Sequence, residues 1–140
     1  MKLLRKSFAQ EIFESFCEYY NNRKLEQIVD LFTINTNLWG TAEDEYIAGR
    51  EGVKKQLERD WRQSEKSEIH IKSFVPAVDN AMWAAAICKA KITLNGKEHV
   101  FDHLRGTIIL KKEKTTWRIA HMHSSFPDYR NVEGNSFPIS

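Results

Sequence analysis

Hydrophobic residues follow a helical spacing in the amino-terminal part of the chain. In residues 7–20 they recur every three or four positions and the glutamates point elsewhere, which predicts an amphipathic helix. Asn21-Asn22 ends this helix and precedes a second one, on which Leu25, Ile28, Val29 and Phe32 share a face. A third helix is predicted over residues 49–62. Residues 33–49 are predicted to be turn-rich, with short extended pieces at 38–39 and 46–47.

After residue 66 the pattern changes to the alternation of β-strands. Strands are predicted over residues 69–75, 81–94, 98–111 and 117–125, with Asn95-Gly96 as a hairpin turn. Helices followed by consecutive long strands indicate an α+β fold, in which helices cover one face of an antiparallel sheet. Because both faces of the later strands carry apolar residues, we expect the second face to be buried in a homodimer.

The last predicted hairpin carries two histidines. Side chains alternate across a strand, so Trp117, Ile119, His121, His123 and Ser125 are predicted to share one face. A turn at Lys114-Thr115 would place Ile108 opposite His121 and Gly106 opposite His123. Because Trp117 and Ile119 favour burial, both imidazoles are predicted to point inward, beside the space that the glycine leaves.

Composition and charge exclude several classes of function. The 140 residues indicate a single domain, 1–140, with a polar tail at 127–140. The net charge of +2 comes from 21 basic and 19 acidic residues that are well mixed, which does not favour a nucleic-acid partner. Neither a membrane span nor a secretory signal is predicted. Cys17 and Cys88 lie far apart in apolar patterns, and buried free thiols in the cytoplasm are expected.

Three stretches carry a resemblance to a known superfamily: WRIAHMHSS at 117–125, RGT at 105–107 and LWGTAEDEYIAGREGV at 38–53. The chain resembles SnoaL-like domains of the nuclear transport factor two-like superfamily. It is also similar to the association domain of calcium/calmodulin-dependent protein kinase II. The resemblance implies a cystatin-like cone, in which N-terminal helices pack on a curved antiparallel sheet around a concave pocket, and a homodimer through the convex face.

The resemblance also implies site residues. His121 and His123 match the paired histidines of the final strand, Trp39 and Tyr46 match aromatic positions at the pocket mouth, and Trp61 matches one at the end of the third helix. Ile87 and Ile108 stand where the association domain has arginines. An acidic ligand is therefore not expected, and a small apolar or aromatic one is. Tyr20 joins these candidates only through its place at the end of the first helix.

The candidate catalytic residues are His121, His123 and Asp102. Imidazole titrates near neutral pH and serves as a general base, and Asp102 would orient it. The alternative is a structural histidine pair. A metal site with His103 or His70 as third ligand is weakly supported by one H-x-H pattern, so no metal or cofactor is expected. Arg105 and Thr107 are assigned to the dimer side.

The sequence therefore predicts a small-molecule-binding protein whose substrate is unknown. An enzyme of the isomerase, cyclase or dehydratase type, using a pocket histidine, is one option. A non-catalytic dimerisation or association module is the alternative. A superfamily with many functions on one scaffold does not decide between them.

Overall fold

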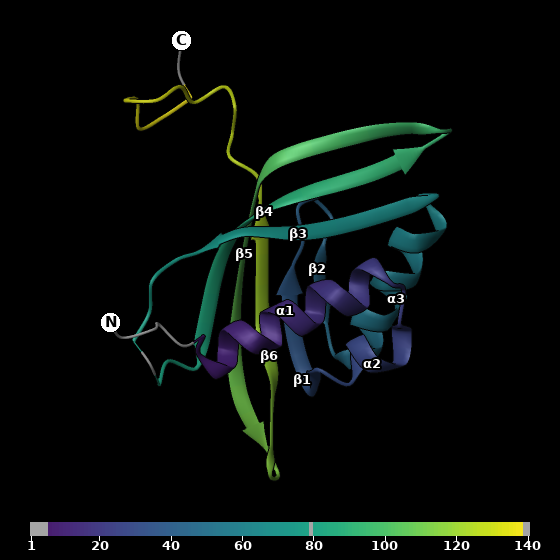
Figure 1. The fold of residues 1–140 in the computed structure, drawn as a ribbon, viewed down its shortest axis with the longest axis vertical. Coiled ribbons are helices and arrows are strands. Elements are labelled where there is room, and N and C mark those ends of the chain that lie inside the picture. Colours follow the sequence, from purple (N-terminus) through teal and green to yellow (C-terminus); the bar gives the residue numbers. More distant parts are fainter. Residues whose placement is uncertain (1–5, 79, 139–140) are drawn as a thin grey trace.

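A computed structural model describes residues 6–78 and 80–138, so residues 139 and 140 of the predicted tail lie outside it. The helices are α1 (Phe8–Asn21), α2 (Leu25–Val29) and α3 (Arg50–Arg62). The strands are β1 (Phe32–Trp39), β2 (Tyr46–Ala48), β3 (Lys66–Phe74), β4 (Trp83–Leu94), β5 (Lys97–Glu113) and β6 (Thr116–Ser125). One sheet has the order β2-β1-β6-β5-β4-β3, and the helices cover one of its faces (Figure 1). The predicted α+β fold is confirmed.

Helix α1 begins at a capping box and crosses the covered face of the sheet (Figure 1). The Ser7 side chain accepts a hydrogen bond from the backbone of Gln10, and the Gln10 side chain accepts one from Ser7. Phe13 packs so closely over Gly106 that a Cβ there would lie 2.9 Å from Phe13 Cζ. A glycine in the middle of β5 therefore lets this helix approach the sheet.

Strand β1 corrects the prediction of a turn-rich segment after the second helix. The helix ends at Val29, and Phe32 begins an eight-residue strand instead of extending the helix. Thr36 and Leu38 are buried, whereas Trp39 is exposed, as expected for a strand with one covered face. Strand β1 runs parallel to β6 and antiparallel to β2. The pairing with these two neighbours, and not the local sequence pattern alone, makes this segment an internal strand of the sheet.

Both predicted hairpin turns are present. Asn95 and Gly96 have φ of 51° and 76° and connect β4 to β5. Glu113 pairs with Thr116, so Lys114 and Thr115 connect β5 to β6 as predicted.

The predicted register beyond this turn is wrong, because β6 contains a β-bulge. Leu110 pairs with Ile119 but Ile109 pairs with His121, which leaves Ala120 as an extra residue. Met122 then lies opposite Ile108, and Thr107 instead of Gly106 lies opposite His123. The residues of β6 after the bulge therefore face opposite sides from those expected for a regular strand.

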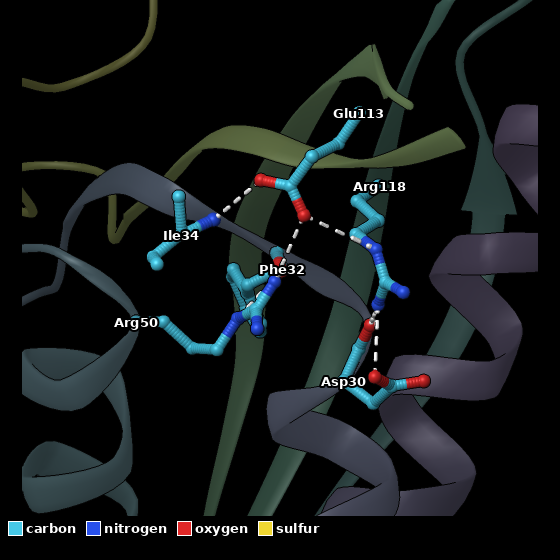
Figure 2. Close-up of polar contacts among 6 residues, drawn as sticks. All are labelled: Asp30, Phe32, Ile34, Arg50, Glu113 and Arg118. Atoms are coloured by element: carbon cyan, nitrogen blue, oxygen red, sulfur yellow. Dashed lines mark hydrogen bonds and ion pairs between the residues drawn. The ribbon is translucent and has the colours of Figure 1, made fainter. Parts of the chain in front are cut away.

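A polar cluster joins β1, α3 and the β5–β6 hairpin (Figure 2). One Glu113 oxygen accepts a hydrogen bond from the Ile34 amide at 2.8 Å, and the other pairs with Arg50 at 3.1 Å and with Arg118 at 3.4 Å. Arg50 also donates to the Phe32 carbonyl at 2.9 and 2.7 Å. Arg118 contacts the backbone and carboxylate of Asp30. We call these six residues the Glu113 cluster.

The sheet face opposite the helices retains large apolar side chains on its surface. We call it the convex face, and the exposed residues that form its convex patch are Trp39, Tyr46, Trp83, Ile87 and Ile109. The C-terminal segment after β6 extends away from the helices (Figure 1), with Tyr129, Val132 and Phe137 exposed. Both cysteines are buried free thiols, as predicted, and burial raises the pKa of Cys88 to about 11.

Candidate functional site

A cavity of about 410 Å³ lies between α1, α3 and the concave face of the sheet. This volume is in the range of sites that hold small molecules. Its wall is mainly apolar, with side chains from helices and strands alike: Phe16, Phe32, Leu38, Val53, Leu57, Ile69, Ile92, Leu94, Phe101, Leu104, Met122 and Phe126. The rings of Phe101 and Phe126 are 5.5 Å apart. An apolar molecule would therefore find mainly apolar contacts here.

Asp60 is the carboxylate held within this wall. The Tyr20 hydroxyl of α1 donates to Asp60 Oδ2 at 3.2 Å, and Gln56 Nε2 donates to Oδ1 at 2.9 Å. Gln56 and Asp60 are one helical turn apart, which brings their side chains together. The Tyr20 ring packs against Trp61 with centroids 5.9 Å apart, and this contact fixes the phenol. Both carboxylate oxygens therefore have donors, and the group has a defined orientation.

The surroundings of Asp60 favour its protonated form. Burial is the main cause that raises the pKa of Asp60 above its ordinary value of 3.8, and the negative charge of Glu45 raises it further. The hydrogen bonds from Gln56 and Tyr20 and the charge of Arg59 act in the opposite direction. Burial and the nearby Asp60 also raise the pKa of Tyr20, so the phenol stays a proton donor.

Ser67, at the start of β3, adds a hydroxyl to this polar group. Its residue is only 2% exposed, and its Oγ has no well-formed hydrogen bond to any residue that the structure describes. It lies near the Tyr20 hydroxyl and acts to lower the pKa of this phenol, against the larger effect of burial. Ser67 also lines the cavity. The Tyr20 phenol is therefore the polar neighbour of this buried hydroxyl.

Glu45 lies at the rim of the cavity, where the loop between β1 and β2 folds back. A Cβ on Gly40 would overlap Glu45 Oε2 at 1.9 Å, so the glycine makes room for this carboxylate. Arg59 lies 4.0 Å from Glu45 and 3.3 Å from Asp44, outside the cavity wall. Among the described residues that line the cavity, none is a lysine, arginine or histidine.

The predicted histidines do not line the cavity. Because of the bulge at Ala120, Met122 and Ser124 line it instead. His121 Nδ1 is hydrogen-bonded to Asn37 Oδ1 on β1, and His123 is exposed beside Thr107. The prediction that both imidazoles point inward is therefore wrong.

Most of the other predicted site residues also lie elsewhere. Asp102 is on the surface, with 55% of its side chain exposed, 3.6 Å from Lys89. The rings of Trp39 and Tyr46 pack against each other on the convex face, with their centroids 4.7 Å apart, and Ile87 is exposed on the same face. Ile108 is fully buried in the core below the cavity wall.

Tyr20 and Trp61 are the predicted site residues that belong to this site. Tyr20 lines the cavity directly, whereas Trp61 supports it from behind. A ligand-contacting role for Tyr20 stays a prediction.

The sequence contained a signal for Asp60 that the prediction did not use. Val53 and Leu57 are buried on one face of α3, and Asp60 follows Leu57 by three residues on this face. A carboxylate on an apolar helix face is unusual and indicates a paired or functional group. Ser67 and Glu45 had no such signal, because their burial depends on how the loop and β3 pack.

The described part of the chain lacks two kinds of feature. No three histidine, cysteine or acidic side chains come together there as metal ligands. None of its helices is long and apolar enough to cross a membrane. The cytoplasmic location stays a prediction.

Several solved structures share this fold. One is a protein from Xanthomonas campestris described as a calcium/calmodulin-dependent protein kinase II association domain, with a TM-score of 0.73, 21% identity, and coverage of 92% of this chain and 94% of that one. Another is an LEH-like epoxide hydrolase from M. tuberculosis, with a TM-score of 0.68, 14% identity and coverage of 86% and 84%. A third, from Catenulispora acidiphila, has a ketosteroid isomerase-like fold and was solved with trimethylamine; its TM-score is 0.67, with 12% identity and 88% of each chain covered.

At these identities the similarity shows the fold and not the function. A comparison with curated proteins finds no match. The model of the SnoaL-like domain matches residues 9–129, which is most of the chain and includes every helix and strand except the first residue of α1. The predicted resemblance is therefore confirmed, and the chain belongs to the SnoaL-like family.

Proposed function

We propose that this protein binds a small, largely apolar molecule in its cavity, and that Asp60 moves a proton from one atom of this molecule to another. The observation that carries the proposal is the buried carboxylate of Asp60, held by Tyr20 and Gln56 at the wall of a mainly apolar cavity. Ionisable groups with shifted pKa values in a concave pocket are typical of active sites. In this proposal Asp60, on α3, takes the role of proton carrier that the sequence suggested for a histidine on β6.

The chemistry that fits is proton abstraction next to an electron-withdrawing group. A raised pKa makes the carboxylate a stronger base than an exposed aspartate and brings its proton affinity closer to neutral pH. Ionised Asp60 would remove a proton from carbon, and protonated Asp60 would return it to a different atom of the same molecule. The net result is an isomerisation or, with loss of a hydroxyl group as water, a dehydration.

The neighbours are consistent with a site for small molecules. One structural neighbour is an epoxide hydrolase, and another was solved with trimethylamine. These properties belong to those proteins, and at 14% and 12% identity they do not transfer a substrate to this chain. They support only the general proposal that a protein of this fold can hold a small molecule.

The test uses binding and turnover together. A panel of aromatic and carbonyl-bearing compounds should include some that raise the melting temperature by mass action. For a compound that is turned over, Asp60→Asn should lower kcat by about a hundredfold or more, because general-base catalysis contributes this much. Asp102→Asn, which changes an exposed carboxylate, is the matched control and should leave kcat unchanged.

A second outcome would contradict the proposal. If Asp60→Asn and Asp102→Asn both retain full turnover while His121→Ala abolishes it, the reaction uses the other face of the sheet. If no compound shifts the melting temperature of the wild-type protein, the cavity is incidental and the assembly alternative gains support.

We also propose that the protein forms a homodimer through its convex face. Exposed Trp39, Tyr46, Trp83, Ile87 and Ile109 support it, because contiguous exposed apolar side chains usually mark an interface. His121 and His123 would then lie within the interface. Ile109→Glu should shift the mass measured by light scattering from dimer to monomer, whereas Val132→Glu, in the exposed tail, should not. An unchanged mass for Ile109→Glu would contradict this interface.

A further inference from the structure

Glu45 places a negative charge at the rim of the cavity. Its side chain lines the cavity, although only 17% of it is exposed. The cation that pairs with it in the described part of the chain is Arg59, at 4.0 Å, which is beyond hydrogen-bond distance. Charged groups that are largely withdrawn from water usually have a close partner. The Glu45 carboxylate is therefore available to a second cation, on the cavity side.

Gly40 allows this carboxylate to take its present position. The Gly40 amide donates to the Glu45 carbonyl at 2.7 Å, which closes the loop before β2. A Cβ on residue 40 would lie 1.9 Å from Glu45 Oε2 and 2.9 Å from its Cβ and Cδ. Gly40 does not have a positive φ, so the space that it leaves, and not its backbone, is what the loop uses. Any larger residue here would push the Glu45 carboxylate aside.

The balance of charges around the cavity favours a positive ligand. Asp60 is the second acid of the wall, and the charge of Glu45 raises the pKa of Asp60, so the two groups act on the same space. Arg59 is shared between Glu45 and Asp44, the latter at 3.3 Å. Arg23 donates to backbone carbonyls at the end of α3. An anion in the cavity would be desolvated beside two acids, whereas a cation would be attracted by both.

The rest of the wall fits an organic cation. Its small hydroxyl and amide side chains are neutral, so they can hydrogen-bond a ligand without deciding the sign of its charge: Thr41, Gln56, Gln63, Ser64, Ser67 and Ser124. Its aromatic side chains provide surfaces that attract ammonium groups and also cover apolar ones: Phe16, Tyr20, Phe32, Phe101 and Phe126. Since no set of three metal-ligating side chains comes together among the described residues, a carbon-bound ammonium group suits this wall better than a metal ion.

We propose that the cavity binds organic ammonium ions, that is, protonated amines on an apolar body, and that Glu45 holds the ammonium group at the rim. This inference rests on the proposed function, because it assumes that the cavity is the binding site. It names the ligand class and adds Glu45 as the residue that determines charge specificity. Asp60 keeps the role of moving the proton, so the two carboxylates of the wall have separate tasks.

The experiment measures dissociation constants by calorimetry at neutral pH for three compounds with the same ring system: naphthylmethylamine, naphthylmethanol and naphthoate. They present a cation, a neutral hydroxyl and an anion. We expect the amine to bind about tenfold more tightly than the alcohol, because hydrogen bonds to charged groups contribute more than those between neutral groups. Naphthoate should bind most weakly, and added salt should reduce the advantage of the amine.

Three variants test the role of Glu45. Glu45→Gln keeps the shape of the side chain and removes its charge, so the amine should lose its advantage while the affinity for the alcohol stays the same. Gly40→Ala should weaken amine binding in the same direction, because the added methyl group displaces the carboxylate. Glu43→Gln is the matched control: Glu43 is an exposed glutamate of the same loop that does not line the cavity, and the preference for the amine should remain.

The outcomes separate this inference from the proposed function. If the amine and the alcohol bind equally to the wild type, or if Glu45→Gln keeps the preference, the role of Glu45 is wrong, while binding of the alcohol still supports the cavity as a binding site. Tighter binding of naphthoate than of the amine overturns the ligand class. If Asp60→Asn abolishes the preference and Glu45→Gln does not, Asp60 holds the ammonium group and the assignment of two tasks is wrong. If none of the three compounds binds, the inference fails, and the compound panel described above decides separately on the proposed function.

Discussion

Two carboxylates, Glu113 and Asp60, occupy opposite settings in this molecule. Glu113, at the end of β5, accepts a hydrogen bond from the Ile34 amide and pairs with Arg50 and Arg118 (Figure 2). Asp60 lines a cavity whose wall also includes Phe101 and Leu104, near the other end of β5. The amide of Ile34 and the two arginines lower the pKa of Glu113, whereas burial raises the pKa of Asp60.

The difference separates a cluster that stabilises the fold from the site that we propose to be functional. At Glu113 every charge has a partner, and the cluster joins β1, α3 and the β5–β6 hairpin. At Asp60 the donors are the neutral side chains of Tyr20 and Gln56, and no basic side chain of the described residues lines the cavity. A folded chain tolerates such an arrangement where it serves binding or catalysis.

The largest effect on stability is expected at the Glu113 cluster. Arg50→Met keeps the length of the side chain but removes the donors to the buried Phe32 carbonyl and the partner of Glu113. We expect a loss of about 1–3 kcal/mol in the free energy of unfolding, measured by urea denaturation. Lys55→Met, at an exposed position of the same helix, should change it by no more than about 0.5 kcal/mol. Equal effects would mean that the cluster does not stabilise the fold.

The next prediction concerns the pH dependence of Glu113. Its lowered pKa means that the folded state stabilises the ionised carboxylate more than the unfolded chain does. The stability that it provides is present above the ordinary value of 4.5 and disappears as the pH falls through the lowered pKa. Glu113→Gln should therefore be less stable than the wild type at neutral pH, and the difference should shrink in acid. A difference that stays constant with pH would contradict the ionic contribution.

Asp60 should behave in the opposite way. Its raised pKa favours the folded state below 3.8, and this advantage is lost as the pH rises through the raised value. Asp60→Asn should therefore gain stability relative to the wild type as the pH rises through this window. Chemical denaturation at several pH values, carried out beside the Glu113→Gln series, measures both signs. If the two series have the same slope, the contrast between the two sites is wrong.

The smallest effect is expected at Asp102, a third acidic side chain that is mostly exposed and 3.6 Å from Lys89. Surface ion pairs of this kind contribute little. Asp102→Asn should change the free energy of unfolding by less than about 0.5 kcal/mol and should leave ligand-induced melting shifts unaltered. A larger change would show that solvent exposure does not account for the ranking of the three acids.

Much of the fold follows from local sequence patterns. The apolar stripes of α1 and α3 and the turn signals Asn95-Gly96 and Lys114-Thr115 specify elements through spacing and backbone preference, and the structure confirms them. The apolar residues on both faces of β4 likewise predicted a second apolar face, on which Trp83 is exposed; Ile87, which was expected in the pocket, is exposed there too.

The candidate site was less predictable because it depends on packing between distant segments. Glu45, Asp60 and Ser67 line the cavity together because the loop before β2, α3 and β3 lie close to one another. No local sequence pattern encodes how these three segments pack. The resemblance drew attention to His121 and His123, but the facing of these side chains depends on one extra residue. Asp60 on the apolar face of α3 was the part of the site that the sequence pattern could have indicated.

Ala120 has a consequence for motifs that relatives share. In a regular strand, a tryptophan and the histidines four and six positions later lie on the same side, whereas the extra residue here separates Ile119 from His121. A relative with identical letters but an unbroken ladder would present its imidazoles to the helices. Shortening this chain at Ala120 should keep Met122 in the cavity, while removing a residue from the regular part of β6 should exchange the two sides. Similar sequences in this strand therefore do not show that the side chains of two proteins face the same side of the sheet, unless their strand pairing is compared as well.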